Sequence, residues 1–178
     1  EHLAPSARAD ALAQMRRVAA RAVVVSGPFD TPGAAWCDRT LDGWHARLHG
    51  RPHPWLAEHV ANGLPSLAET VRLLGVESGD GREGTEAAVQ VFAHGDLTAW
   101  FLMRAADLLA SALPGALEAG AALSRAFNRH LAGRPPRAAA YRHILIRDLR
   151  AGAPQIAPPW SRVNPEAPAD GGVAAMLE

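Results

Sequence analysis

Residues 88–113, AVQVFAHGDLTAWFLMRAADLLASAL, join an alternating segment to a long apolar one. The alternation over residues 88–93 predicts a strand. Residues 97–113 are rich in Leu and Ala, which favour a helix, and Asp96 is a suitable residue to cap its N-terminus. We therefore expect a strand that leads through a short turn directly into a helix.

The rest of the chain is dominated by helical patterns. Helical spacing, breakers, or caps such as Thr31 and Ser66 delimit helical segments at residues 6–22, 31–49, 54–61, 66–74, 117–131 and 141–149. The β-branched run Val23–Val25 predicts one further short strand. These patterns together predict a mainly α fold: a compact bundle of about six helices with at most a small two-stranded β element, formed by residues 23–25 and 88–93.

The composition of two segments predicts the domain organisation. Residues 75–86, GVESGDGREGTE, are glycine-rich and acidic, which predicts a mobile surface loop within a single helical domain over residues 1–152. Residues 153–178 contain five prolines and few large apolar side chains, which predicts an extended or disordered tail. Trp160 and Ile156 lie in this tail, and we expect them to dock on a partner or on the domain itself.

The charge balance excludes several classes of function. The chain has 178 residues and no lysine, so mechanisms that need a lysine, such as a Schiff base or a Walker-type phosphate loop, are excluded for these residues. Its 18 arginines are dispersed and balanced by 18 acidic residues, which argues against a nucleic-acid partner. No apolar run reaches the roughly 18 residues of a membrane span.

The single cysteine, Cys37, excludes an internal disulfide and a cysteine-based zinc site. Beside Trp36 at the start of a helix it could serve as a nucleophile, but a packed core position is more typical of such a residue. A lone thiol is compatible with a reducing compartment, and we expect a cytoplasmic protein.

His94, Gly95 and Asp96 follow the predicted strand and precede the predicted helix. Side chains at the carboxyl end of a strand often form sites, so His94 and Asp96 are candidate catalytic residues that would act as an acid–base pair. In the alternative interpretation, Gly95 forms the turn and Asp96 only caps the helix.

A second candidate site is rich in histidine. His45 and His49 are four residues apart on a helix, the spacing of helical metal ligands, and either Glu58, Asp38 or Asp42 could complete a mononuclear metal site. Four histidines fall within fifteen residues: His45, His49, His53 and His59. In the alternative interpretation, the pair only flanks the apolar stripe of its helix.

Three motifs resemble the C-lobe of aminoglycoside-phosphotransferase-like kinases: LDGWHARLHG at 41–50, PWLAEH at 54–59 and VFAHGDL at 91–97. The similarity spans roughly residues 40–102 and implies that Asp96 is a catalytic base. The magnesium-binding Asn of that family falls at Phe101, and neither its second metal-binding Asp nor its lysine-bearing N-lobe has a counterpart here. The resemblance therefore implies a degenerate protein, or pseudoenzyme, because phosphoryl transfer depends on Mg²⁺ and a cationic clamp.

Taken together, these patterns predict a non-catalytic helical binding or scaffold module that binds a peptide or a partner subunit, of which a degenerate phosphotransferase-like protein is one form. The alternative is a small enzyme that acts on a small molecule through His94 and Asp96, or through a metal at His45 and His49. We expect no cofactor and no membrane partner, and a homo-oligomer is compatible with the sequence.

Overall fold

The structure is a computed structural model, and it describes residues 2–75, 89–130 and 139–150. Within these ranges the chain forms six helices and three strands, in the order α1 Pro5–Val18, β1 Ala22–Pro28, α2 Pro32–His49, α3 Pro54–Asn62, α4 Leu67–Gly75, β2 Gln90–Asp96, α5 Leu97–Ala112, α6 Leu117–His130 and β3 Ala140–Asp148. The prediction of a mainly α fold is confirmed. The β element is larger than expected, because it has three strands.

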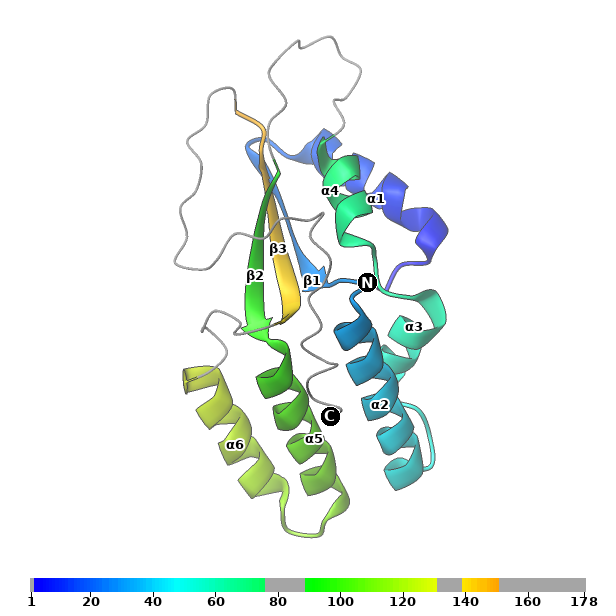
Figure 1. Cartoon of the computed structure of the whole chain (residues 1–178), viewed down its shortest axis with the longest axis vertical. Coiled ribbons are helices and arrows are strands. Elements are labelled where there is room, and N and C mark those ends of the chain that lie inside the picture. Colours follow the sequence, from blue (N-terminus) through cyan, green and yellow to red (C-terminus); the bar gives the residue numbers. More distant parts are fainter. Residues whose placement is uncertain (1, 76–88, 131–138, 151–178) are drawn as a thin grey trace.

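The three strands form an antiparallel sheet in the order β1-β3-β2. Leu145 at the middle of β3 lies opposite Val25 on one side and Val91 on the other. Helices α1 and α4 lie beside this sheet, whereas α2, α5 and α6 lie side by side at the other end of the molecule (Figure 1). The last described element is thus hydrogen-bonded to both earlier strands.

The helix predicted over residues 141–149 is wrong, because this segment is the central strand β3. Alternate residues of β3 are buried on one face: Tyr141, His143, Leu145 and Arg147. Two of these four positions carry polar side chains, so the apolar alternation that marks a strand is hidden in the sequence. Arg147 is accommodated because its guanidinium donates a hydrogen bond to the carbonyl of Leu74.

Most other segments form where their caps predict. The Oγ1 of Thr31 accepts a hydrogen bond from the Ala34 amide at the start of α2, and the Oγ of Ser66 accepts one from Glu69 before α4. Gly50 ends α2 with φ +71°, a left-handed conformation that favours glycine. The first helix is shorter than predicted and ends at Val18, since Ala22 already belongs to β1.

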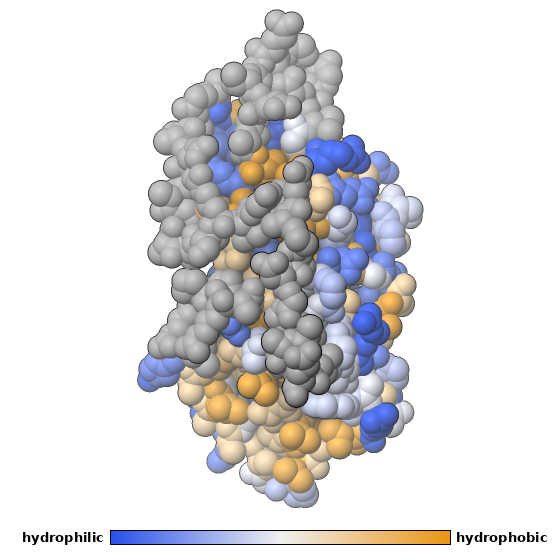
Figure 2. Space-filling view, in the orientation of Figure 1, coloured by the Kyte–Doolittle hydropathy of each residue, from blue (hydrophilic) through white to orange (hydrophobic). Residues whose placement is uncertain are grey.

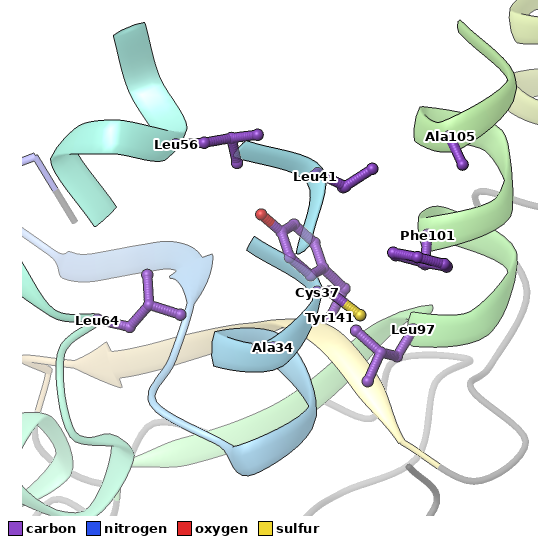
Figure 3. Close-up of a cluster of buried hydrophobic side chains, with 9 residues drawn as sticks. All are labelled: Ala34, Cys37, Leu41, Leu56, Leu64, Leu97, Phe101, Ala105 and Tyr141. Carbon is purple, nitrogen blue, oxygen red and sulfur yellow. The ribbon is translucent and has the colours of Figure 1, made fainter. Parts of the chain in front are cut away.

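Two apolar clusters stabilise the fold. One lies between the sheet and helices α1 and α4: Leu12, Val23, Phe29, Leu74, Val91 and Leu145. The other joins α2, α3 and α5 to the start of β3 (Figure 3): Ala34, Cys37, Leu41, Leu56, Leu64, Leu97, Phe101, Ala105 and Tyr141. Because β3 contributes a residue to each cluster, this strand connects the two halves of the core.

The surface retains apolar residues over the lower part of α5 and α6 (Figure 2). No helix in the described ranges combines the length and the apolarity that a membrane crossing requires. The predicted mobile loop, apart from Gly75, and the predicted tail with Ile156 and Trp160 lie outside the described residues.

His143 on β3 makes the stability of the fold depend on pH. Burial lowers the pKa of His143 from 6.5 to about 4, so this imidazole is neutral in the folded protein at neutral pH. Its ring packs edge-on against Phe29, with ring centroids 5.9 Å apart. In the unfolded chain the ring takes up a proton below pH 6.5, which favours unfolding.

We expect His143 to contribute a loss of roughly 2–3 kcal/mol of unfolding free energy as the pH falls from 7.5 to 4.5. Urea denaturation at both pH values measures this change. In His143→Gln this part of the pH dependence disappears, whereas His130→Gln, an exposed control on α6, retains it. Equal pH dependence in the wild type and in His143→Gln would contradict the assignment.

Candidate functional site

Asp96 is the last residue of β2 and caps α5. Its Oδ1 accepts a hydrogen bond of 2.9 Å from the Ala99 amide, as the capping interpretation predicts. His94 is half-buried and lies opposite Arg142 of β3. The magnesium-ligand position of the resembled kinases, Phe101, is a core residue whose ring lies 5.3 and 5.8 Å from those of Trp36 and Trp44.

The structure brings three of the four clustered histidines together at the end of α2. The ring centroid of His45 lies 4.5 Å from that of His49 and 5.0 Å from that of His53. His45 Nδ1 donates to the carbonyl of Arg51 at 2.8 Å. His49 Nε2 donates to Ser111 Oγ at 3.1 Å, because the Ser111 hydroxyl proton is already donated to a backbone carbonyl. These contacts fix the orientation of the two rings on α2.

The surroundings of His53 oppose a metal cation. Burial first, and then the charges of His45 and Arg104, lower the pKa of His53. His45, His53 and Arg104 line a cavity of about 20 Å³, which holds roughly one water molecule. A divalent ion there would face the Arg104 guanidinium, and among the described residues no three His, Cys, Asp or Glu side chains are arranged to hold a metal. His45 and His49 therefore offer two potential metal ligands, and the described residues place no third ligand beside them.

Cys37 lies in the buried cluster of Figure 3, as its predicted core role requires. Burial and the neighbouring charge of Asp38 raise the pKa of the thiol from 9.0 to about 12. The thiol is therefore protonated at neutral pH and is a poor nucleophile.

A buried hydrogen bond between a histidine and a carboxylate connects α2 to α3. His59 Nδ1 donates to Asp38 Oδ2 at 2.9 Å, and the two side chains are only 7% and 2% exposed. The Tyr141 hydroxyl of β3 donates to the other carboxylate oxygen at 3.4 Å, and the Tyr141 ring stacks on Trp100 at a centroid distance of 3.5 Å. The Asp38 carboxylate thus holds α2, α3 and β3 together.

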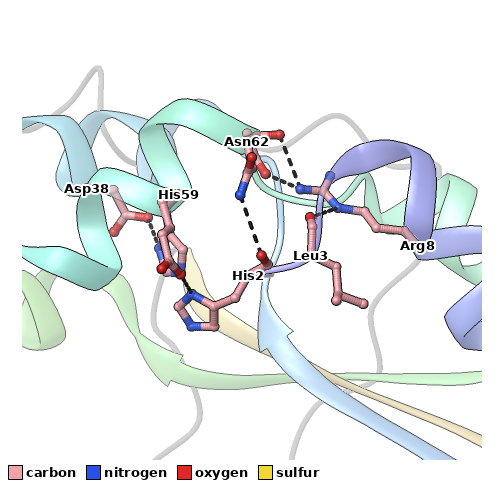
Figure 4. Close-up of polar contacts among 8 residues, drawn as sticks. His2, Leu3, Arg8, Asp38, His59 and Asn62 are labelled. Atoms are coloured by element: carbon pink, nitrogen blue, oxygen red, sulfur yellow. Dashed lines mark hydrogen bonds and ion pairs between the residues drawn. The ribbon is translucent and has the colours of Figure 1, made fainter.

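The N-terminal residues cross the end of α3 and cover His59 (Figure 4). His2 Nδ1 contacts a Glu58 carboxylate oxygen at 2.7 Å, and the His2 ring centroid lies 5.0 Å from that of His59. Arg8 fastens the same segment, since its guanidinium donates to the carbonyls of Leu3 and Asn62 at 3.2 Å each. His59 Nε2 is buried and has no hydrogen-bond partner among the described residues.

A pocket of about 110 Å³ opens beside this pair. Asp38 and His59 form its inner wall, and Asp30 and Arg39 line it with exposed side chains. The sequence did not identify Asp38 and His59 as a pair, although one signal was present. Asp38 shares the buried face of α2 with Ala34, Cys37 and Leu41, and a carboxylate on a buried helix face requires a partner.

Helix α5 carries an apolar stripe that continues onto its C-cap residue Leu113, and we call this stripe the α5 seam: Leu102, Ala106, Leu109 and Leu113. Its three leucines are 59%, 53% and 59% exposed, and Leu117 at the start of α6 is 67% exposed. The spacing of four and three residues places Leu102, Ala106 and Leu109 on one side of the helix, and Leu113 follows at its C-terminal end. This side is used neither for the core with Phe101 and Ala105 nor for the packing on α6.

No family model matches the chain, and no significant match was found among curated proteins or among solved structures.

A double-mutant cycle tests whether Asp38 and His59 act as a unit. We expect Asp38→Ala and His59→Ala each to cost about 3 kcal/mol of unfolding free energy, because each leaves a buried polar group without its partner. The coupling energy should be at least about 1 kcal/mol. In the exposed control pair, His2→Ala with Glu58→Ala, it should stay below about 1 kcal/mol. Chemical denaturation measures these free energies. If the changes caused by Asp38→Ala and His59→Ala are additive, the two side chains are not energetically coupled and the expectation is contradicted.

Proposed function

We propose that this protein is a non-catalytic helical association module that pairs with a second copy of itself through the α5 seam. The observation that carries the proposal is the exposed pair Leu102 and Leu109 on one side of α5, continued by the exposed Leu113 at its C-cap, on a helix whose other sides are occupied. Large exposed apolar residues that gather in one patch are typical of protein–protein contacts.

The spacing of the seam supports a helix as its occupant. The steps of four and three residues from Leu102 through Ala106 to Leu109 are those of the a and d positions of a coiled coil, at which a facing helix inserts its side chains. Ala106 lies at the middle of the seam, where a small side chain permits close approach of a second helix. The 16 residues of α5 extend about 24 Å, enough for a short helix–helix contact.

The residues beside the seam support a second copy as the partner. Coiled coils that select a different chain carry charges at the flanking e and g positions. Here Ala105 is buried in the core, and the other flanking positions also hold only uncharged residues: Met103, Ala110 and Ala112. Identical uncharged seams can pair about a twofold axis without like-charge repulsion.

The state of the candidate catalytic groups supports the non-catalytic part of the proposal. Asp96 caps α5 through one carboxylate oxygen, the Cys37 thiol has its pKa raised to about 12, and the N-terminal residues cover His59. A core role for Phe101 is likewise compatible with a degenerate phosphotransferase-like ancestry.

Sedimentation equilibrium of the full chain tests the proposal. We expect a reversible dimer in the wild type. Leu109→Glu should weaken dimerisation by roughly 100-fold, because it buries a charge at the centre of the contact in both copies. Leu123→Glu is the matched control: Leu123 is also an exposed leucine, but it lies on α6 outside the seam, so its variant should dimerise as the wild type does.

Circular dichroism should show that both glutamate variants are folded, because both leucines are exposed. A wild type that remains monomeric at roughly 100 µM, a concentration at which a micromolar dimer is well populated, would contradict self-association and leave a helix of another protein as the occupant. A Leu109→Glu variant that dimerises like the wild type would place the contact elsewhere.

A further inference from the structure

We propose that the pocket between α2 and α3 binds a small zwitterion of the α-amino acid class, with Arg39 as the partner of its carboxylate and Asp30 as the partner of its ammonium group. This proposal depends on different residues from those of the α5 seam, so either can fail without the other.

The rim of the pocket carries two opposite charges that are not used within the fold. Asp30 precedes α2 and Arg39 lies on α2, and both side chains are exposed and line the pocket. Within residues 2–75, 89–130 and 139–150, neither side chain has a hydrogen bond or an ion pair. The Asp30 backbone is held in place, since its amide donates to the carbonyl of Pro65 at 2.9 Å. An unpaired carboxylate and an unpaired guanidinium at one opening suit a ligand that carries both charges.

The inner wall offers few free acceptors to a ligand. The Asp38 carboxylate already accepts hydrogen bonds from His59 and Tyr141, so it offers little to the ammonium group of a ligand. His59 lines the pocket, but its partnerless Nε2 atom is buried, so it is not among the contacts proposed for the ligand. The ammonium group therefore pairs with Asp30 at the rim.

Size and lining define the class of ligand further. A volume of about 110 Å³ is well below the roughly 300 Å³ of sites for nucleotides or drug-sized molecules. Ala35, Val60 and Leu64 supply apolar surface for a short aliphatic side chain. A simple anion would be repelled by Asp30, and a simple cation would be repelled by Arg39. A ligand with one charge therefore gains less binding free energy than a zwitterion does.

The test is a titration of the full ¹⁵N-labelled chain with L-alanine, followed by the amide resonances of α2, α3 and residues 63–64. We expect saturable shifts with a dissociation constant in roughly the millimolar range. Propionate, which lacks the ammonium group, and ethylamine, which lacks the carboxylate, should each bind at least about tenfold more weakly, since each loses one charged hydrogen bond.

Two variants assign the contacts. Arg39→Gln and Asp30→Asn should each weaken L-alanine binding by at least about tenfold, because each removes one charged hydrogen bond. Both variants should still give the NMR spectrum of a folded protein, because both side chains are exposed. Arg47→Gln, at an exposed arginine of α2 that does not line the pocket, is the control and should bind as the wild type does. Absence of saturation by L-alanine, equal binding of the single-charge analogues, or full binding by both variants would each overturn the proposal.

Discussion

The hydrogen bonding of β3 to both other strands is the constraint on which the rest of the structure depends. β1 leads into α2 and β2 leads into α5, so the two pairings of β3 fix where these helices begin. The backbone strengthens this link, since the Leu97 amide at the start of α5 donates to the carbonyl of Ala139 just before β3. Tyr141 then reaches from β3 into the cluster between α2 and α5 and donates to Asp38. The sheet and the helical end are therefore stabilised together.

The sequence predicted the elements whose signals are local. The caps at Thr31, Ser66 and Asp96 act within one turn of their helices, and all three form as expected. β3 could not be recognised in this way, because His143 and Arg147 occupy buried positions that only the neighbouring elements make tolerable. Polar residues whose burial depends on distant neighbours remove the local pattern on which strand prediction depends.

The same distinction between local signals and contacts with distant residues applies to the candidate sites. The spacing of His45 and His49 correctly predicted that their rings lie together, but Arg104, which makes that surface unfavourable for a cation, comes from α5, far along the chain. The contact between Asp38 and His59 spans 21 positions, so it required the packing of α3 on α2. The proposed functions follow from tertiary structure in both cases: a helix side left open by its neighbours, and a pocket formed where two helices meet.

Nuclear Overhauser contacts of the labelled chain test the central role of β3 most directly. The account predicts cross-strand contacts from Leu145 to both Val25 and Val91, together with slow hydrogen exchange of the amides at the centre of β3. Residues 141–149 that instead show the i to i+3 contacts of a helix, with no contacts to Val25 or Val91, would contradict the account.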